Sequence, residues 1–209
     1  MAFVAASCIG LLFGGIAIGV ALGGVMPLPY GPVAAIEQYI RAHPTAIQVI
    51  AVAVFASSVP LAVYAATAGA QLRQLGVTAP TAAIAVTGGV IAAGALGLTG
   101  LLAWTLSRPE VSGDGALVTT LYYLVFLVGG AGHIVALGLL VGGMAISGQL
   151  SRSVARAGLA IAGLCEFTTL VLIWPKLGPI LPVARVSALV WLVVAGAWLP
   201  LRRNGIRPD

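Results

Sequence analysis

Six long apolar stretches constrain the fold of this chain more than any other feature. A helix needs about 20 mostly apolar residues to cross a hydrocarbon core about 30 Å thick, because it rises about 1.5 Å per residue. The six stretches cover about residues 3–26, 46–70, 80–106, 116–146, 157–174 and 183–201. The sequence therefore predicts an all-α fold, in which one domain (residues 1–209) crosses a bilayer as a bundle of about six helices.

The amino-acid composition points to the same environment. Only 7% of the 209 residues are charged and 60% are hydrophobic, against about 25% and 45–50% in a soluble domain. In water such a chain would expose apolar patches far larger than monomeric proteins tolerate. The net charge of +5 does not indicate nucleic-acid binding, because the basic residues stand singly or in pairs without an aromatic platform. We expect the lipid bilayer as partner and no nucleic acid.

Arginine and lysine in the short connections predict the orientation, because cytoplasmic loops carry an excess of them. If the N-terminus is cytoplasmic, one group of bases lies inside: Arg73, Arg152, Arg156, Arg202, Arg203 and Arg207. The outer group is smaller: Arg41, Arg108, Lys176 and Arg185. The bias is modest, and it predicts that both termini are cytoplasmic.

The connection at 27–45 has features of a helix of its own. Pro32 suits the first turn of a helix, and Glu37 and Arg41 can pair at a spacing of four residues. We expect a short helix over about 32–42 that lies in the outer membrane interface. A lid that gates an entry is the alternative interpretation.

Three ionisable residues within the spans are the candidates for function. His133 lies near the middle of the fourth span, Glu166 near the middle of the fifth, and Arg185 a few residues into the sixth. A charge in mid-bilayer costs at least about 2.5–3.5 kcal/mol, so each needs a partner or a purpose. Arg185 could pair with Glu166 or extend to the interface, and Glu166 could instead stay protonated.

Two interpretations of these residues stay open. In the first, His133, Glu166 and Arg185 form a buried hydrogen-bond network that fixes helix packing. In the second, His133 and Glu166 line a polar pocket for a ligand or a proton, since histidine titrates near neutral pH. Residue counting places both at one depth, but it does not show that they touch.

The leading functional hypothesis is a non-enzymatic membrane protein, a binding, transport or channel-like bundle with a small apolar ligand, a lipid or a proton at its polar centre. The alternative is a membrane-embedded enzyme acting on a lipid or isoprenoid, with Glu166 as general acid and His133 as its partner. The spans hold no second carboxyl for such chemistry. A third hypothesis is an accessory subunit of a membrane complex.

Several motifs of enzymes and cofactor sites are absent from the sequence. It has no P-loop, no HExxH and no GxSxG. Two histidines cannot ligate a pair of bis-histidine haems, and the spans do not supply a metal-ligand set. We therefore expect no cofactor and no metal. Cys8 and Cys165 lie in apolar stretches, so a disulfide is not expected.

Small residues and one proline predict local features of the helices. Gly15, Gly19 and Gly23 form a GxxxGxxxG row, and such rows allow close helix packing, within a bundle or in a homo-oligomer. Candidates for a helix kink are the mid-span residues Ser57, Ser58 and Pro60, because proline removes a backbone hydrogen bond.

The segments PLAVYAATAGAQLRQLGVTAP, RPEVSGDGALV, GGAGHIVALGLLVGG, ARAGLAIAGLCEFTTLVLIWP and ILPVARVSALVWLVVAGAWLPLRR follow one another in this order. In this respect the chain resembles a group of small six-span bacterial membrane proteins of unknown function, common in actinobacteria. The resemblance covers about residues 50–203 and implies a six-helix fold in a bacterial inner membrane. It implies no activity and no role for any residue.

Overall fold

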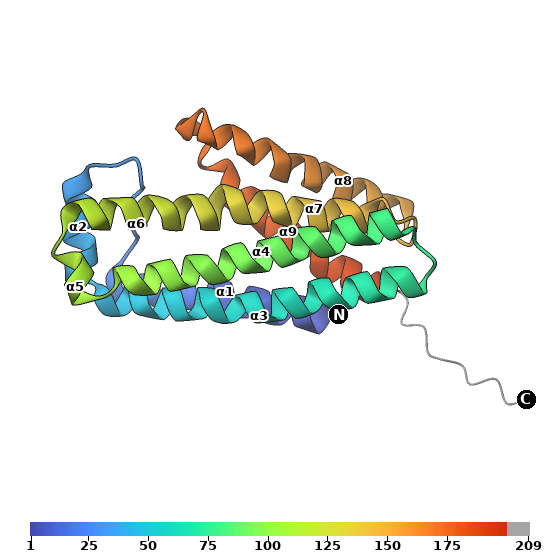
Figure 1. The fold of residues 1–209 in the computed structure, drawn as a ribbon, viewed down its shortest axis with the longest axis horizontal. Coiled ribbons are helices and arrows are strands. Elements are labelled where there is room, and N and C mark those ends of the chain that lie inside the picture. The colour runs from blue at the N-terminus through green and yellow to red at the C-terminus, as the bar shows by residue number, and fades with distance from the viewer. Residues whose placement is uncertain (200–209) are drawn as a thin grey trace, which may run out of the picture.

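The computed structural model describes residues 1–199 and shows a bundle of long helices (Figure 1). Six helices are long and apolar enough to cross a membrane, and no strand occurs in the described part. The predicted all-α six-span fold is confirmed. The helices are α1 (Ala2–Gly23), α3 (Pro44–Gln74), α4 (Ala79–Leu106), the α6–η1–α7 span (Gly115–Ala145), the α8–η2 span (Arg152–Leu172) and α9 (Ile180–Trp198).

The fourth and fifth spans are not uniform α-helices. In the fourth span, α6 (Gly115–Leu127) and α7 (His133–Ala145) are joined without a break by a π-helix, η1 (Val128–Gly132). The fifth span changes from α8 (Arg152–Phe167) to a 3₁₀-helix, η2 (Thr168–Leu172). A second 3₁₀ turn, η3 (Pro175–Leu177), follows it. These irregular segments surround the candidate site described below.

The observed helix bounds lie close to the predicted ones except at the fifth span. That helix begins at Arg152 rather than at about 157. The first turns of α8 carry two arginines and a serine, so apolarity alone does not detect them, although the backbone is already helical. The sixth helix begins at Ile180 and ends at Trp198, whereas the expected end near 201 and the basic residues Arg202, Arg203 and Arg207 lie outside the described residues.

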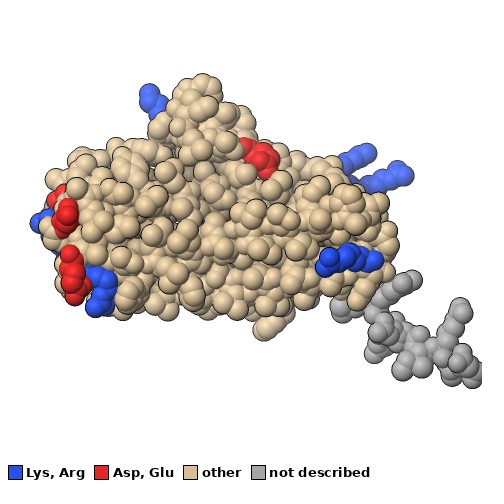
Figure 2. Space-filling model, in the orientation of Figure 1, with Lys and Arg blue, Asp and Glu red and all other residues tan. Residues whose placement is uncertain are grey.

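Most charged side chains lie toward the two ends of the long axis, and the belt between them is apolar except for an acidic patch on one flank (Figure 2). The beginning of α1 and the end of α9 lie toward one end of that axis (Figure 1), which we call the termini end. The opposite end carries α2 (Val33–Ala42) and α5 (Pro109–Ser112), and we call it the α2 end. This separation of charge and apolar surface is the distribution that a bilayer requires.

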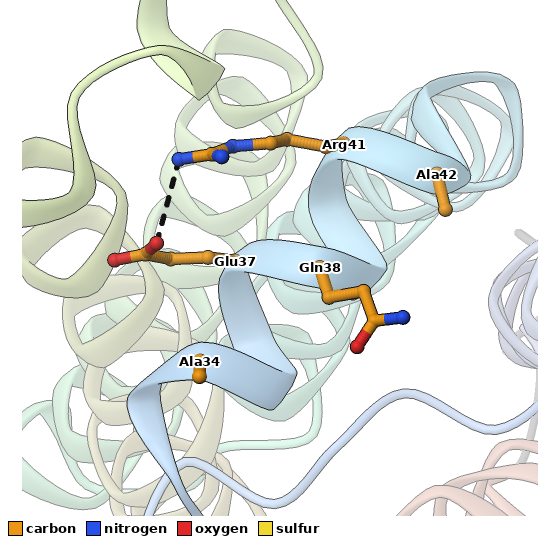
Figure 3. Close-up of a pocket in the computed structure, with 5 residues that line it drawn as sticks. All are labelled: Ala34, Glu37, Gln38, Arg41 and Ala42. Atoms are coloured by element: carbon orange, nitrogen blue, oxygen red, sulfur yellow. Dashed lines mark hydrogen bonds and ion pairs between the residues drawn. The ribbon is translucent and has the colours of Figure 1, made fainter.

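The predicted short helix is present as α2, and it is fixed to its neighbours. Arg41 Nη2 lies 3.4 Å from Glu37 Oε2 (Figure 3), and Arg41 Nε donates to the Ser112 carbonyl over 3.0 Å. Its other face buries Ile36 and Ile40 in a small apolar cluster with residues of α3, α4 and α6. The open hollow beside this ion pair, also lined by Gln38, is exposed surface rather than an enclosed site (Figure 3).

The glycine row of α1 packs within the bundle. Carbon atoms added as a Cβ at Gly15, Gly19 and Gly23 would meet side chains at the beginning of α3. The row therefore lets α1 and α3 lie close together, as small residues do in membrane bundles. The interpretation as a packing contact inside the bundle is confirmed.

The candidate kink residues lie in a helix that continues without interruption. Pro60 is inside α3, which runs from Pro44 to Gln74. The hydroxyl of Ser57 donates to the Val54 carbonyl over 2.7 Å, and the hydroxyl of Ser58 bonds three residues back in the same way. Both serine hydroxyls thus donate their hydrogen bonds within their own helix and have no further proton to donate into a neighbouring cavity.

Candidate functional site

A large, partly open cavity lies in the half of the bundle nearer the α2 end. Its volume is about 840 Å³, and its wall is formed by α1, the 24–30 loop, α3, α4, the α6–η1 junction and residues 175–185. Four lining residues have polar side chains, namely Tyr30, Thr99, Lys176 and Arg185; the remaining lining residues are apolar or glycine. This volume lies within the range of about 300–1,000 Å³ that is typical of small-molecule sites.

Arg185 brings a cation into this apolar cavity. It lies on the second turn of α9, and its Nη2 donates to the carbonyl of Gly129. Its Nε is buried and has no hydrogen-bond partner. The ion pairs found among residues 1–199 join Arg41 to Glu37 and Arg108 to Glu110, so no described acid neutralises Arg185.

The carbonyl that accepts from Arg185 belongs to the π-helix. Gly129 is the second residue of η1, whose sequence is VGGAG. A Cβ at Gly129 would lie 2.6 Å from Thr99 Cγ2, so only glycine allows this approach of η1 to α4. π-turns inside α-helices occur frequently at functional sites. Sequence analysis did not single out this segment, although three glycines in mid-span are a signal, since glycine weakens an α-helix.

His133 is completely buried at the start of α7, directly after the π-helix. Its Nδ1 lies 2.9 Å from the carbonyl oxygen of Ala92. Because a carbonyl only accepts, Nδ1 carries the proton and Nε2 presents a lone pair. Nε2 is buried without a partner, and the Arg185 guanidinium binds the Gly129 carbonyl, four residues before His133. His133 thus ties α7 to α4 behind the cavity, but it does not line the cavity.

Glu166 lies elsewhere, on the exposed side of α8. A Cβ at Gly138 would lie 3.2 Å from Glu166 Oε1, so the carboxyl rests against the middle of α7. Gly138 is five residues beyond His133, which places the two about 140° apart around α7 and about 7.5 Å apart along it. Figure 2 shows acidic atoms on the flank over α8, away from the charged ends.

The structure therefore brings two of the three candidates together and separates the third. Arg185 and His133 are neighbours around η1, whereas Glu166 faces outward. The ion pair between Glu166 and Arg185, one of the alternatives that the sequence left open, does not form. The physical reason is rotational: α8 directs Cys165 into the bundle, while the next residue, Glu166, lies at the exposed edge of the contact between α8 and α7.

Tyr30 is a cavity residue that sequence analysis missed. It lies in the loop between α1 and α2, and its ring makes an edge contact with Phe126 at 5.4 Å between centroids and a tilted contact with Tyr123 at 6.2 Å. Burial, followed by the proximity of Tyr123, raises the pKa of Tyr30 above its usual value. The phenol consequently stays neutral and can donate a hydrogen bond. The run PLPYGP was visible in the sequence, but nothing in it indicates which helix the ring contacts.

No protein-family model, curated protein or solved structure gives a significant match to this chain. The resemblance to six-span bacterial membrane proteins consequently stays an expectation, and no relative assigns a role to a residue. The six apolar helices and the apolar belt make this chain a multi-pass membrane protein.

Proposed function

We propose that this chain is a non-enzymatic membrane protein that binds an apolar or amphipathic molecule in the cavity beside Arg185, as a carrier or a transport protein does. The observation that supports this most strongly is the 840 Å³ cavity with an apolar wall and a single buried cation. Protein interiors are close-packed, and voids larger than a water molecule are few. A cavity of this volume is therefore large enough to bind a small molecule.

The chemistry of the cavity wall favours binding over catalysis. The lining residues include no carboxylate and no histidine. An enzyme acting on a lipid or isoprenoid would need a positioned acid or base within hydrogen-bond reach of its substrate, most often a histidine or a carboxylate. For this role the cavity wall offers only the Tyr30 phenol and the exposed Lys176 ammonium. Glu166, the expected general acid, is on the outer side of α8.

The proposed location is a bacterial inner membrane, with both termini in the cytoplasm. Arg73 ends α3, and Arg152 and Arg156 begin α8, all at the termini end of the bundle. Cytoplasmic loops carry an excess of such residues. A cysteine-accessibility assay with a membrane-impermeant maleimide tests the orientation: Ser151→Cys should react only in permeabilised cells, and Ser112→Cys in intact cells.

A cavity-filling variant tests the binding function. Val20 lines the cavity from α1, whereas Val52 on α3 faces outward with 55% of its surface exposed. The probe is hexadecanol that carries a photoreactive diazirine in its tail, and its adducts are mapped by mass spectrometry of protein in nanodiscs. We expect Val20→Trp to reduce labelling of residues 24–30 and 175–185 at least fivefold, because the indole occupies space in the cavity that the probe's tail needs. Val52→Trp, which adds the same bulk outside, should leave this labelling unchanged.

Equal labelling of these segments in all three proteins would contradict the proposal, since the probe would then report ordinary contact with lipid. Loss of labelling in both variants would also contradict it, because bulk outside the cavity would then matter as much as bulk inside.

A second candidate function, an accessory subunit or homo-oligomer, is favoured by the outward position of Glu166. The neighbouring Gly163 has open space around it, so another helix could approach this face closely. A carboxyl exposed to lipid gains from such a partner, because an uncompensated polar group in hydrocarbon is costly. Glu166→Gln should leave the oligomeric state in mild detergent unchanged if this face is free, and should weaken the assembly if a partner binds it.

A further inference from the structure

We propose that the occupant of the cavity is an anionic single-chain amphiphile, with its carboxylate or phosphate head bound by Arg185 and its tail along the apolar wall of the cavity. This inference rests on the proposed binding function and names the class of ligand. Four features of the structure carry it.

The first is the state of the guanidinium. It has five N–H donors in a planar fork, which match the two oxygens of a carboxylate or phosphate. Among the described residues, only the Gly129 carbonyl accepts from Arg185, while its Nε is buried without a partner. The bond to Gly129 orients the fork and leaves donors for a ligand.

The second is the sign of the charges. Arg185 and Lys176 are the charged residues of the cavity wall, and both are cations. The acids Glu37 and Glu110 at the α2 end pair with Arg41 and Arg108. A neutral or cationic guest would leave Arg185 as an uncompensated charge in apolar surroundings, which is the costly arrangement for a buried ion.

The third is the position of the two cations. Arg185 lies on the second turn of α9, whereas Lys176 lies in η3, before α9 begins, and is exposed. Water already solvates the ammonium of Lys176, so it gains little from an anion. The partly buried guanidinium gains more, and the head group therefore belongs at Arg185.

The fourth is the apolar wall. Leu12, Ile16 and Val20 form a stripe on α1 along the cavity, and Leu96 and Phe126 contribute to other parts of the wall. The hydroxyl of Thr99 is already donated to the Ala95 carbonyl over 2.7 Å. This wall suits an alkyl chain and offers little to a small hydrated anion such as inorganic phosphate.

The experiment compares three probes with one tail: palmitate, hexadecyl phosphate and hexadecanol, each carrying the same tail diazirine. The protein is held in nanodiscs of phosphatidylcholine, which has no net charge. The concentration of probe that gives half-maximal labelling of residues 24–30 and 175–185 is measured at pH 8. We expect a value at least tenfold lower for the anions than for hexadecanol, and no competition by inorganic phosphate.

Two variants that each remove one positive charge locate the head group. Arg185→Gln should raise the half-maximal concentration of the anions at least tenfold and change that of hexadecanol less than threefold. Lys176→Gln removes a cation from the same cavity and should change all three values less than threefold. The comparison of palmitate with hexadecyl phosphate separates a fatty acid from a phosphorylated lipid as the source of the anion, and a preference for either supports the proposal.

Equal half-maximal concentrations of the three probes in the unaltered protein would overturn the anionic ligand while leaving the binding function in place. This comparison needs no variant, so it decides even if Arg185→Gln does not fold. A loss of preference in Lys176→Gln rather than in Arg185→Gln would overturn the placement of the head group. Failure of every probe, hexadecanol included, to label the cavity would overturn the proposed function itself.

Discussion

The two halves of the bundle differ in how closely their helices pack and in the polar groups that they bury. At the termini end, small residues let the helices touch: a Cβ at Gly143 would lie 2.6 Å from the Ala85 backbone nitrogen, and one at Gly158 would lie 2.5 Å from the Trp191 ring. Trp191 Nε1 there donates to the Val154 carbonyl over 2.9 Å, although Gln71 Oε1 is buried without a partner. Nearer the α2 end, the helices separate around 840 Å³, and Arg185 Nε has no partner.

This difference indicates that the two halves have different roles. Close packing and satisfied hydrogen bonds are the main sources of helix affinity in a bilayer, where no hydrophobic drive acts between helices. The packed half can therefore hold the fold, while the open half can keep a cavity and an uncompensated cation. Proteins commonly place such locally unfavourable features at functional sites.

The largest expected effect comes from overfilling the packed half. Gly143→Leu forces a side chain against the backbone of α4 and should destabilise the fold by about 3 kcal/mol, measured by denaturation in mixed micelles. Gly94→Leu is the matched control, because Gly94 is exposed on α4 and nothing lies within 4 Å of an added Cβ. Equal losses in the two variants would contradict the packing contrast.

Removing the cation from the open half should raise the free energy of unfolding instead of lowering it. Arg185→Met replaces a poorly compensated ion by an apolar side chain of similar length, which should stabilise the ligand-free protein by about 1 kcal/mol. The measurement is the same denaturation in mixed micelles. A loss of stability would show that Arg185 supports the fold, as in the buried-network interpretation.

A smaller loss is expected when one hydrogen bond of the packed half is removed. The hydroxyl of Tyr64, which is fully buried, donates to the Leu192 carbonyl over 2.8 Å and joins α3 to α9. Tyr64→Phe deletes only this donor and should cost about 1 kcal/mol. An unchanged free energy of unfolding would mean that this bond does not help to hold the packed half together.

The contacts of Arg41 that hold α2 in place should contribute less to the stability of the fold than the Tyr64 hydrogen bond. Arg41→Gln removes a surface ion pair with Glu37, which is worth about 0.5 kcal/mol or less, and weakens the link to Ser112. The free energy of unfolding should therefore hardly change. Probe labelling of residues 24–30 would rise in this variant if α2 acts as a lid, and would stay constant if α2 is a fixed cap.

The smallest effect on stability is expected at Glu166. A carboxyl that faces lipid is less costly in its protonated form. Glu166→Gln then exchanges one exposed neutral polar group for another and should change the free energy of unfolding by less than about 0.5 kcal/mol. In proteoliposomes, flux and its pH dependence should also be unchanged, because the carboxyl lies outside the cavity. A loss of pH dependence would restore Glu166 as a proton-relay residue.

The all-α class, the number of candidate spans, the short helix α2 and the ability of the α1 glycine row to pack closely against another helix all follow from the sequence alone. Each follows from a one-dimensional property: the length of an apolar run, the spacing of a charge pair or the repeat of small residues. The sequence also indicated that placing His133, Glu166 and Arg185 within the bilayer costs free energy, whichever way their side chains point. Depth along a span can be counted from residues.

Which of these three side chains lie close together depends on how the helices pack in the tertiary structure. In α8 the residues Arg152, Arg156 and Glu166 fall within about 80° of one another around the helix, so the outward direction of Glu166 could have been deduced from this polar face. A helix that is apolar on most sides, such as α7, has no polar face to reveal its rotation. The π-helix adds a further rotation, because the extra residue in its turn changes the register of His133 relative to α6. The cavity, and the placing of Arg185 within it, arise from how α1, α6 and α9 pack together, and no single helix encodes that arrangement.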